Sequence, residues 1–401
     1  MKRSSRLLVF FLCLAGPCVA GEVREGNPQS VVPSIDVRAR YEFADIDGFD
    51  ASHAATLRAR PGLRWDVPGG FLTTFVEGGY NFVAVGDYHG GAPGATPDDP
   101  ANSTIADPRN AALNQAWVMI GPCDGLSAKL GRQRLIHDDA AFLGNVGWRQ
   151  NEQTFDAASL TWQPSGAWRV DYAWIGRVNR IFGQQADGIF RSLDTNIHAL
   201  DATHAMASGI ELGASFQYMD FHDTAATGLD NRTLGARASG KSAIADWRAD
   251  LSWQDRAGPG DANDAWRFRI TATRDFGGHR IRAGIEHLDR GFQSPLATLH
   301  ALNDYADATA GRRAAGTHGG LTDTHLAHTF AMPWGGLELT NKLHAFGDNA
   351  VGTGVGAAWD LVLTMPMGNH AKAMLKSMWF DARDARYQDT RRVALQIEVS
   401  Y

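Results

Sequence analysis

The chain alternates apolar and charged residues in the stretch Ile35-Asp36-Val37-Arg38-Ala39-Arg40-Tyr41-Glu42-Phe43. Side chains of a β-strand point alternately to its two faces, so this period of two predicts a strand with one apolar and one charged face. The same period recurs in residues 57–66, 246–253 and 266–271 and again at the end of the chain, in residues 393–401. The sequence therefore predicts an all-β protein.

The connections between these strands fall into two classes. Eight are short and carry glycine or proline, at 67–70, 121–125, 163–166, 206–209, 238–241, 275–278, 333–336 and 366–369. Nine are mostly longer and more polar, near 45–54, 86–112, 134–154, 178–196, 222–231, 254–264, 289–322, 346–353 and 381–391. Alternation alone also fits a secreted soluble β-sandwich, but short turns at one end and long loops at the other are typical of outer-membrane barrels. With both termini on the turn side, we expect a transmembrane antiparallel β-barrel of about 18 strands, with short periplasmic turns and long extracellular loops.

The N-terminus has the features of a secretory signal peptide. A basic start is followed by an apolar run and by the small residues of a cleavage site, Cys18-Val19-Ala20. We expect a signal peptide over residues 1–20, cleaved near Ala20, a periplasmic lead-in over residues 21–34, and one barrel domain over residues 35–401. Export followed by barrel formation indicates the outer membrane of a Gram-negative bacterium.

The composition narrows the classes of partner. Lys and Arg number 38 against 44 Asp and Glu, a formal net charge of -6, which disfavours nucleic acid. The expected partners are outer-membrane lipid, an anionic polysaccharide or small anionic solute, and export or assembly machinery in the periplasm.

The charged strand faces point inward if the apolar faces meet lipid. Arginine dominates these faces, and its planar fork binds carboxylates or phosphates bidentately and stays charged at any working pH. The pattern indicates anionic solutes, and the alternative is that Arg–Asp ladders only brace and narrow the barrel. The predicted interior basic residues are Arg38, Arg40, Arg58, Arg60, Arg64, Arg169, Arg177, Arg248, Arg267, Arg269, Arg280, Arg282, Lys372, Lys376 and Arg392.

Two of the long loops are unusually apolar for segments in water. Loop 134–154 contains Leu135, Ile136, Phe142, Leu143, Val146 and Trp148, and loop 289–322 contains Phe292, Pro295, Leu296, Leu299, Leu302 and Tyr305. The constriction residues expected in the two loops are Trp148, Gln150, Phe292, Pro295 and His300. Apolar loops of this length tend to pack against the rest of the protein. We expect both loops to fold into or over the pore and to form its constriction.

Longer motifs run through the chain in a fixed order: Leu130-Gly131-Arg132-Gln133-Arg134, Asp138-Asp139, Phe142–Asn151, Thr154-Phe155-Asp156-Ala157, Val178–Gly183, Thr233–Arg237 and Phe292–His300. From about residue 35 to the terminus, the sequence resembles the alginate export family of outer-membrane porins. The resemblance implies an eighteen-stranded barrel and passive passage of an alginate-like polyuronate or related anionic solutes through an arginine-rich constriction. The residues to which it assigns this role are Arg132, Arg134, Asp138, Asp139, Trp148, Arg149, Gln150, Asp156 and Arg180.

The same resemblance leaves the solute open, because one fold serves many functions. The alternative is a general or small-solute diffusion porin with no polysaccharide role. The 14 histidines are dispersed, and His318 and His325 beside Asp323 lack the spacing of a metal site. A lipid hydrolase would need a lipid-facing serine, whereas Ser252 falls on the interior face. We therefore expect a pore without turnover, metal or cofactor.

Overall fold

The chain folds into a closed antiparallel barrel, as the sequence predicts. The computed structural model describes residues 30–256, 264–302, 305–316, 319–333, 335–348 and 352–401, and over these residues it contains eighteen strands. The predicted signal peptide lies outside the described residues. No helix of the described part is long and apolar enough to cross a bilayer.

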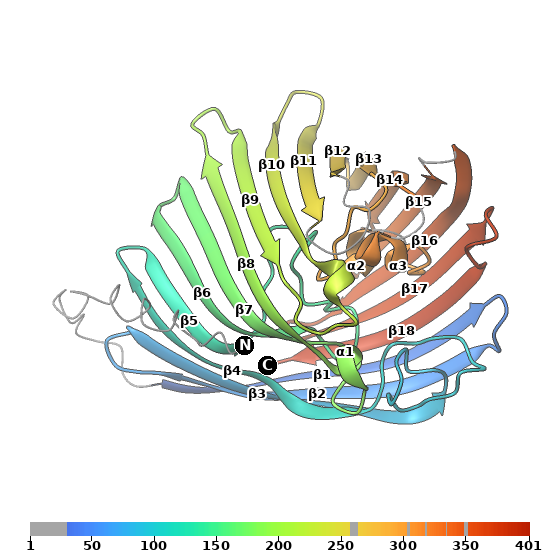
Figure 1. Cartoon of the computed structure of the whole chain (residues 1–401), viewed down its shortest axis with the longest axis horizontal. Coiled ribbons are helices and arrows are strands. Elements are labelled where there is room, and N and C mark those ends of the chain that lie inside the picture. Colours follow the sequence, from blue (N-terminus) through green and yellow to red (C-terminus); the bar gives the residue numbers. More distant parts are fainter. Residues whose placement is uncertain (1–29, 257–263, 303–304, 317–318, 334, 349–351) are drawn as a thin grey trace.

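The elements follow one another in simple up-and-down order (Figure 1). The strands are β1 (Ser30–Ile46), β2 (Ser52–Asp66), β3 (Leu72–Asp87), β4 (Asn110–Cys123), β5 (Leu126–Gln133), β6 (Thr154–Ser165), β7 (Trp168–Asn179), β8 (Ser192–Ala205), β9 (Glu211–Met219), β10 (Asn231–Lys241), β11 (Asp246–Arg256), β12 (Ala265–Phe276), β13 (His279–Leu288), β14 (Leu321–Ala331), β15 (Glu338–Asp348), β16 (Thr353–Met367), β17 (Ala371–Ala382) and β18 (Thr390–Ser400). The short helices are α1 (Gly188–Arg191), α2 (Leu299–Leu302), α3 (Ala310–Ala315) and the 3-10 helix η2 (Thr227–Leu229).

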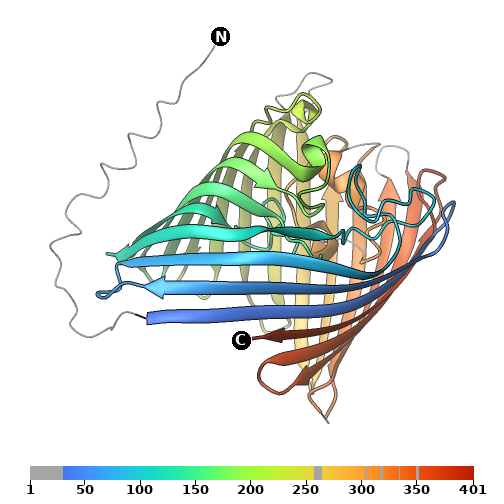
Figure 2. The same ribbon diagram turned by 90° about the horizontal axis from the view of Figure 1, so that it is seen from below.

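The barrel closes where β1 meets β18. Their register runs from Asp36 opposite Ser400 to Ile46 opposite Thr390, and β1 pairs with β2 along its other edge. Figure 2 shows the blue β1 beside the red β18 at this seam. Closure gives every described strand a hydrogen-bonded neighbour on both sides, which suits a bilayer because it offers no water to an exposed backbone.

The two strand faces differ as the alternation predicts. Leu57 and Ile397 are 43% and 44% exposed, whereas their neighbours Arg58 and Gln396 are 2% and 3% exposed. Apolar side chains thus cover the outer surface, where they contact lipid, and polar side chains are enclosed within the barrel.

The lengths of the connections also agree with the sequence prediction, apart from two boundaries. β1 already begins at Ser30, within the expected lead-in 21–34. The predicted turn 238–241 is wrong, because β10 continues to Lys241 and Gly240 pairs with Trp247 in the ladder. The chain reverses over residues 242–245, where the Ser242 hydroxyl oxygen accepts hydrogen bonds from the backbone N–H groups of Ile244 and Ala245. A serine turn, rather than a glycine, therefore makes this reversal.

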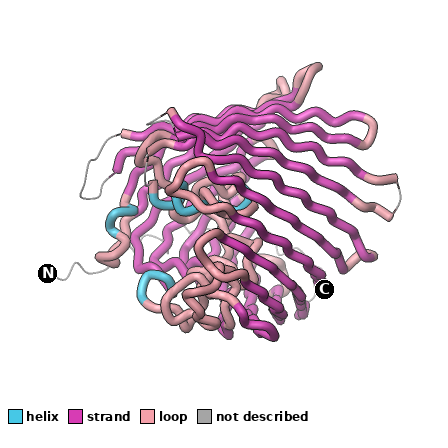
Figure 3. The backbone as a smooth tube through the Cα atoms, turned by 90° about the vertical axis from the view of Figure 1, so that its right-hand side faces the viewer, coloured by secondary structure: helices cyan, strands magenta, loops and turns pink. Residues whose placement is uncertain are grey.

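Part of the interior is apolar. The inner faces of β6, β7 and β8 carry Phe155, Ile175 and Ile197, all fully buried, and these pack with Leu143 and Leu296 from two different loops. Figure 3 shows loops gathered inside the barrel near the end that carries the long connections. This apolar core gives the loops a surface on which to pack.

Candidate functional site

Loop 134–153 and loop 289–320 meet inside the barrel, and we call their contact the loop junction. Leu143 and Leu296 form a parallel bridge, and the Gly144 N–H donates to the Leu296 carbonyl at 2.9 Å. The Val146 N–H donates to Thr298 Oγ1 at 3.1 Å. The two apolar loops identified in the sequence therefore fold into the barrel and bind each other.

Arginines of β1 hold loop 134–153 against the wall. Arg38 Nη1 donates to the carbonyls of Gly147 and Trp148 at 3.1 and 3.2 Å. Arg40 Nη2 donates to the Trp148 carbonyl at 2.5 Å, and its Nη1 forms an ion pair with Asp107 at 2.8 Å. Arg38 is thus enclosed, and its guanidinium group binds the loop backbone and, at 3.0 Å, Glu398 of β18.

Other predicted residues brace the same region. Arg58 binds Asp36 and, at 3.3 Å, Glu398. The Gln150 amide donates to Thr56 Oγ1 at 2.8 Å, and its backbone N–H donates to Asp107 at 2.6 Å. These contacts join β1, β2 and β18 to one another and β2 to loop 134–153, which in turn binds the loop of Asp107.

Glu152 is a buried anchor that the sequence analysis missed. Its carboxylate accepts from Arg134 Nε and Nη2 at 2.7 and 2.5 Å, and Arg60 lies 3.2 Å away. Burial favours the neutral acid, but Arg60 and Arg134 outweigh it and lower the pKa of Glu152 to about 2. Arg134 thus has a loop acid as its partner.

Trp148 lies between two cations at the loop junction. The guanidinium of Arg40 is 3.9 Å, and the ammonium of Lys376 3.8 Å, from the centre of its indole ring. The ring also stacks on His300, with centroids 4.7 Å apart and planes 4° apart. These cation–π and stacking contacts hold Trp148 in the interior.

His300 links Lys376 to a buried acid. Its Nε2 lies 2.9 Å from Lys376 Nζ, and its Nδ1 lies 2.9 Å from Asp307 Oδ1. Burial, together with the charge of Lys376, lowers the pKa of His300 to about 3 despite Asp307, so the ring is neutral. A neutral ring with its proton on Nδ1 donates to Asp307 and accepts from Lys376. Arg149, another predicted site residue, pairs with Asp307 at 2.7 Å.

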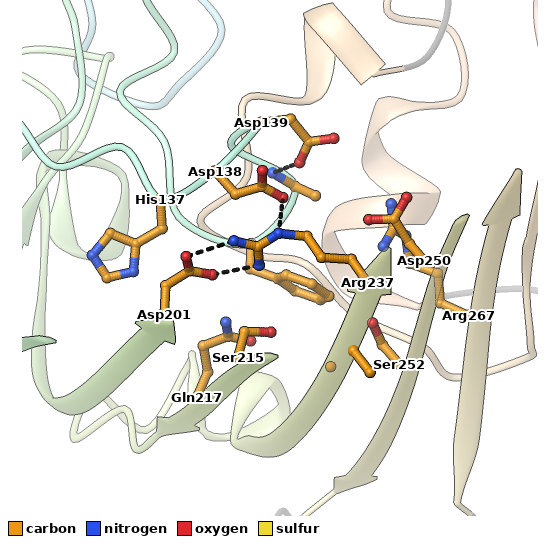
Figure 4. Close-up of a pocket in the computed structure, with 14 residues that line it drawn as sticks. His137, Asp138, Asp139, Asp201, Ser215, Gln217, Arg237, Asp250, Ser252 and Arg267 are labelled. Carbon is orange, nitrogen blue, oxygen red and sulfur yellow. Dashed lines mark hydrogen bonds and ion pairs between the residues drawn. The ribbon is translucent and has the colours of Figure 1, made fainter. Parts of the chain in front are cut away.

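A row of arginines lies on another part of the barrel wall, formed by β10, β11, β12 and β13. We call it the arginine row, and it comprises Arg237, Arg248, Arg267, Arg269 and Arg282. Arg237 forms two hydrogen bonds of 2.7 Å with Asp201 and lies 3.6 Å from Asp138 (Figure 4). Arg267 is buried against Glu286 at 2.6 Å. Arg282 is exposed and has no hydrogen bond or ion pair with another described residue.

Loop 134–153 supplies two carboxylates to this row. Arg248 Nη1 donates to Asp138 at 2.9 Å, and Arg269 donates to Asp139. Asp138 has φ +51°, a left-handed conformation that few residues other than glycine adopt. A cavity of about 20 Å³ remains here, room for about one water molecule while the two loop carboxylates occupy the row.

The interior is more open toward the turn end. There the side chains of Arg64, Arg169, Arg280 and Lys372 are half exposed or more, and each pairs with an adjacent acid at 2.6–3.1 Å. A cavity of about 210 Å³ extends from this side toward the loop and is lined by Lys129, Arg134 and Arg169, among others. Charged groups near the turns are therefore accessible, whereas those near the loops are enclosed.

Arg132 and Asp156 do not take the predicted place in the interior. They pair with each other at 2.7 Å and share a strand face with Leu130, which is 64% exposed, while Lys129 is on the opposite face. Alternation along β5 and β6 therefore places them on the outer face. Arg132 still borders a cavity of about 30 Å³ that Arg58 lines, where β4 continues past the end of β5.

The remaining predicted residues lie apart from the arginine row. Arg180 follows β7 in the chain and donates to the Ile189 carbonyl at 3.3 Å. Phe292 is 2% exposed and faces the ring of Phe142 at 6.1 Å, and the half-buried Pro295 directly precedes Leu296. The loop acids Asp107, Glu152 and Asp307 and the β8 acid Asp201 were not predicted, since each meets its arginine only through the tertiary fold.

A closed antiparallel barrel with an apolar outer face and loops folded inward is an outer-membrane porin. Three solved porins of Pseudomonas aeruginosa share the fold. OccK3 (OpdO) is 12% identical with a TM-score of 0.70, and the match covers 93% of this chain and 96% of that one. OccK9 (OpdG) is 14% identical with a TM-score of 0.70 and coverages of 93% and 99%, and OpdK with vanillate is 12% identical with a TM-score of 0.67 and coverages of 92% and 99%. The model of the alginate export family matches residues 35–286, and the chain belongs to that family. No curated protein matches the chain significantly.

Proposed function

We propose that this porin gives anionic solutes passive passage along the arginine row, with alginate-like polyuronate as the solute class. The observation that carries the proposal is the placement of arginines on the interior face of four successive strands. Carboxylate is the natural partner of a guanidinium group. A polyuronate repeats carboxylates along its chain and can engage several of these arginines in succession.

The partners of the row favour an exchange of carboxylates. Asp138 and Asp139 are about a quarter exposed and come from a loop, so an entering carboxylate can replace them without disturbing the strands. By contrast, Arg38 and Arg40 bind backbone carbonyls and brace the barrel. The two sequence-based interpretations of the arginines, transport and bracing, thus apply to different residues.

The second candidate function is a small-solute porin, favoured by the little space, about 20 Å³, that loop 134–153 leaves at the row. The OpdK structure holds vanillate, which is a small carboxylate. A single carboxylate needs only one exposed guanidinium, such as that of Arg282. In either case the protein moves solutes without chemical turnover.

Planar-bilayer recording tests both functions. The reversal potential in a salt gradient gives the ion selectivity, and polymannuronate added to one side is expected to block the current. Arg282→Gln removes an exposed charge that pairs with no other described residue and is expected to lower both anion selectivity and block. Arg280→Gln, two residues nearer the turn on the same strand face, is the matched control and should change both much less. A cation-selective channel would refute the proposal, and an anion-selective channel indifferent to polymannuronate would establish the small-solute porin instead.

A further inference from the structure

Three potential metal ligands converge on the interior wall at β14 and β15, beside the β13 end of the arginine row. His325 and His344 are directly opposite in the register of the two strands, and Asp323 is the next inward-facing residue on β14. Asp323 and His344 are 2% and 4% exposed, and the side chain of His325 is 10% exposed. Potential ligand atoms of the three residues all lie within 4.8 Å of one another.

Two buried polar atoms of this cluster lack a hydrogen bond in the observed geometry. His344 Nδ1 lies 2.8 Å from Asp323 Oδ1, a normal hydrogen bond, but His325 Nδ1 lies 3.7 Å from Asp323 Oδ2. The longer distance is beyond hydrogen-bond range. Both Asp323 Oδ2 and His325 Nδ1 are buried without a hydrogen-bond partner. Buried polar groups without partners are rare and point to a missing ligand or ion.

We propose that Asp323, His325 and His344 form a binding site for a divalent transition-metal ion of the zinc type. Two imidazole nitrogens and a carboxylate are typical zinc ligands, and water can complete the tetrahedron. With bonds of about 2.0–2.2 Å, the ligand atoms of such a site are roughly 3.3–3.5 Å apart. The observed 2.8 and 3.7 Å lie on either side of that spacing, so shifts of a few tenths of an ångström suffice.

Neighbouring residues place these ligands. His325 lies over Gly284 of β13, where an added Cβ would come within 2.7 Å of the imidazole Cε1 and Nε2. His344 Nε2 lies 3.9 Å from Asp360 Oδ2, so a metal on Nδ1 would leave Nε2 facing a carboxylate, as in many metal sites. Asp360 Oδ2 also accepts from the Tyr305 N–H at 3.2 Å, which connects the site to loop 289–320.

The charges around the cluster also suit a divalent cation. Glu286 faces Asp323 across the ladder but has Arg267 as its partner, and Lys342 faces Asp360. The carboxylates of Asp323 and Asp360 flank the two histidines. The competing explanation is a protonated histidine paired with Asp323, with no metal. The sequence alone does not indicate this site, because His344 lies on the next strand and its spacing from His325 along the chain does not show that the two are close.

Zinc titration of the untagged, EDTA-treated protein in detergent tests the proposal. Calorimetry is expected to show one saturable ion per chain, and Co²⁺ should give the visible absorption bands of a low-symmetry site. His325→Ala should abolish both signals. Gly284→Ala, which only displaces the His325 ring, should weaken zinc binding by about 10–100-fold, as loss of a positioning contact does.

His328→Ala is the matched control, because His328 lies on the outer face of the same strand beside His279. Its zinc affinity should equal that of the wild type. Retention of the heat-modifiable barrel band on an unboiled gel shows that each variant is folded. Absence of saturable zinc binding in the wild type would overturn the proposal, and so would loss of binding in His328→Ala with retention in His325→Ala.

Discussion

Replacing Asp138 and Asp139 together by asparagine is expected to increase anion selectivity strongly. The two loop carboxylates pair with Arg248 and Arg269, which Asp250 of β11 also contacts at 2.6 and 3.0 Å. Asparagine keeps the size of each side chain and removes only its charge. The loop remains held by Arg38 and Arg40 through its backbone, so the pore walls should stay in place.

The size of the effect follows from the distances. A solute carboxylate bound at the row would lie about 4 Å from each aspartate, where two unit charges interact by about 1 kcal/mol even in water. Removing both repulsions gives ~2 kcal/mol, and since about 1.4 kcal/mol is a factor of ten, the anion-to-cation permeability ratio should rise roughly 30-fold. The Debye length falls to about 3 Å at 1 M salt, so most of this gain should disappear there.

Reversal potentials in salt gradients, recorded at low and at high mean salt, measure this ratio. The control is Asp275→Asn, which removes one charge from the same strand face near the turn, where the aspartate is more than half exposed. It should change selectivity only slightly. Unchanged selectivity in the double variant at low salt, with unaltered single-channel conductance, would refute the role assigned to the row.

Two further predictions concern the loop anchors. Glu152→Gln leaves Arg60 and Arg134 without their carboxylate, and breaking such a buried pair should cost about 3–5 kcal/mol at pH 7. Because the pKa of Glu152 is lowered to about 2 in the fold, its contribution is present above about pH 4.5 and is lost as the pH falls toward 2. Thermal unfolding should therefore separate wild type and variant at pH 7 and bring them together near pH 2; equal Tm values at pH 7 would contradict this. Trp148→Ala removes the ring that Arg40 and Lys376 contact. It should increase single-channel conductance and lower the free energy of unfolding by roughly 3–5 kcal/mol. A variant with wild-type conductance would exclude Trp148 from the constriction.

The barrel could be predicted because its signals are local. Strand alternation and connection length are both read within a few residues, and they specify topology when neighbouring strands pair in chain order. The turn at 238–241 was misplaced because glycine content was used to locate it, whereas the Ser242 hydroxyl makes the actual turn. Glycine inside a strand is a weaker turn signal than its frequency in turns implies.

The site was harder to predict for a physical reason. Arg40 and Asp107 are 67 residues apart in the chain, and Arg149 and Asp307 are 158 apart, so no local pattern pairs them. Arg132 is a different case, because its position two residues after Leu130 already places it on the outer strand face. The family motif predicts an interior position for Arg132, whereas the strand alternation predicts the outer face, and the structure agrees with the alternation.

The abundance of arginine in this sequence cannot by itself distinguish a transport path from a braced wall. What separates the two is the partner of each guanidinium group. A backbone carbonyl, as found by Arg38, is fixed by the fold and cannot be exchanged for a solute without displacing the loop. A loop carboxylate, as found by Arg248, has the same chemistry as the proposed solute and can be exchanged. Arginines whose partners are loop carboxylates, or which have no hydrogen-bond or ion-pair partner among the described residues, as Arg282 does, are therefore the residues at which solute selectivity should be sought.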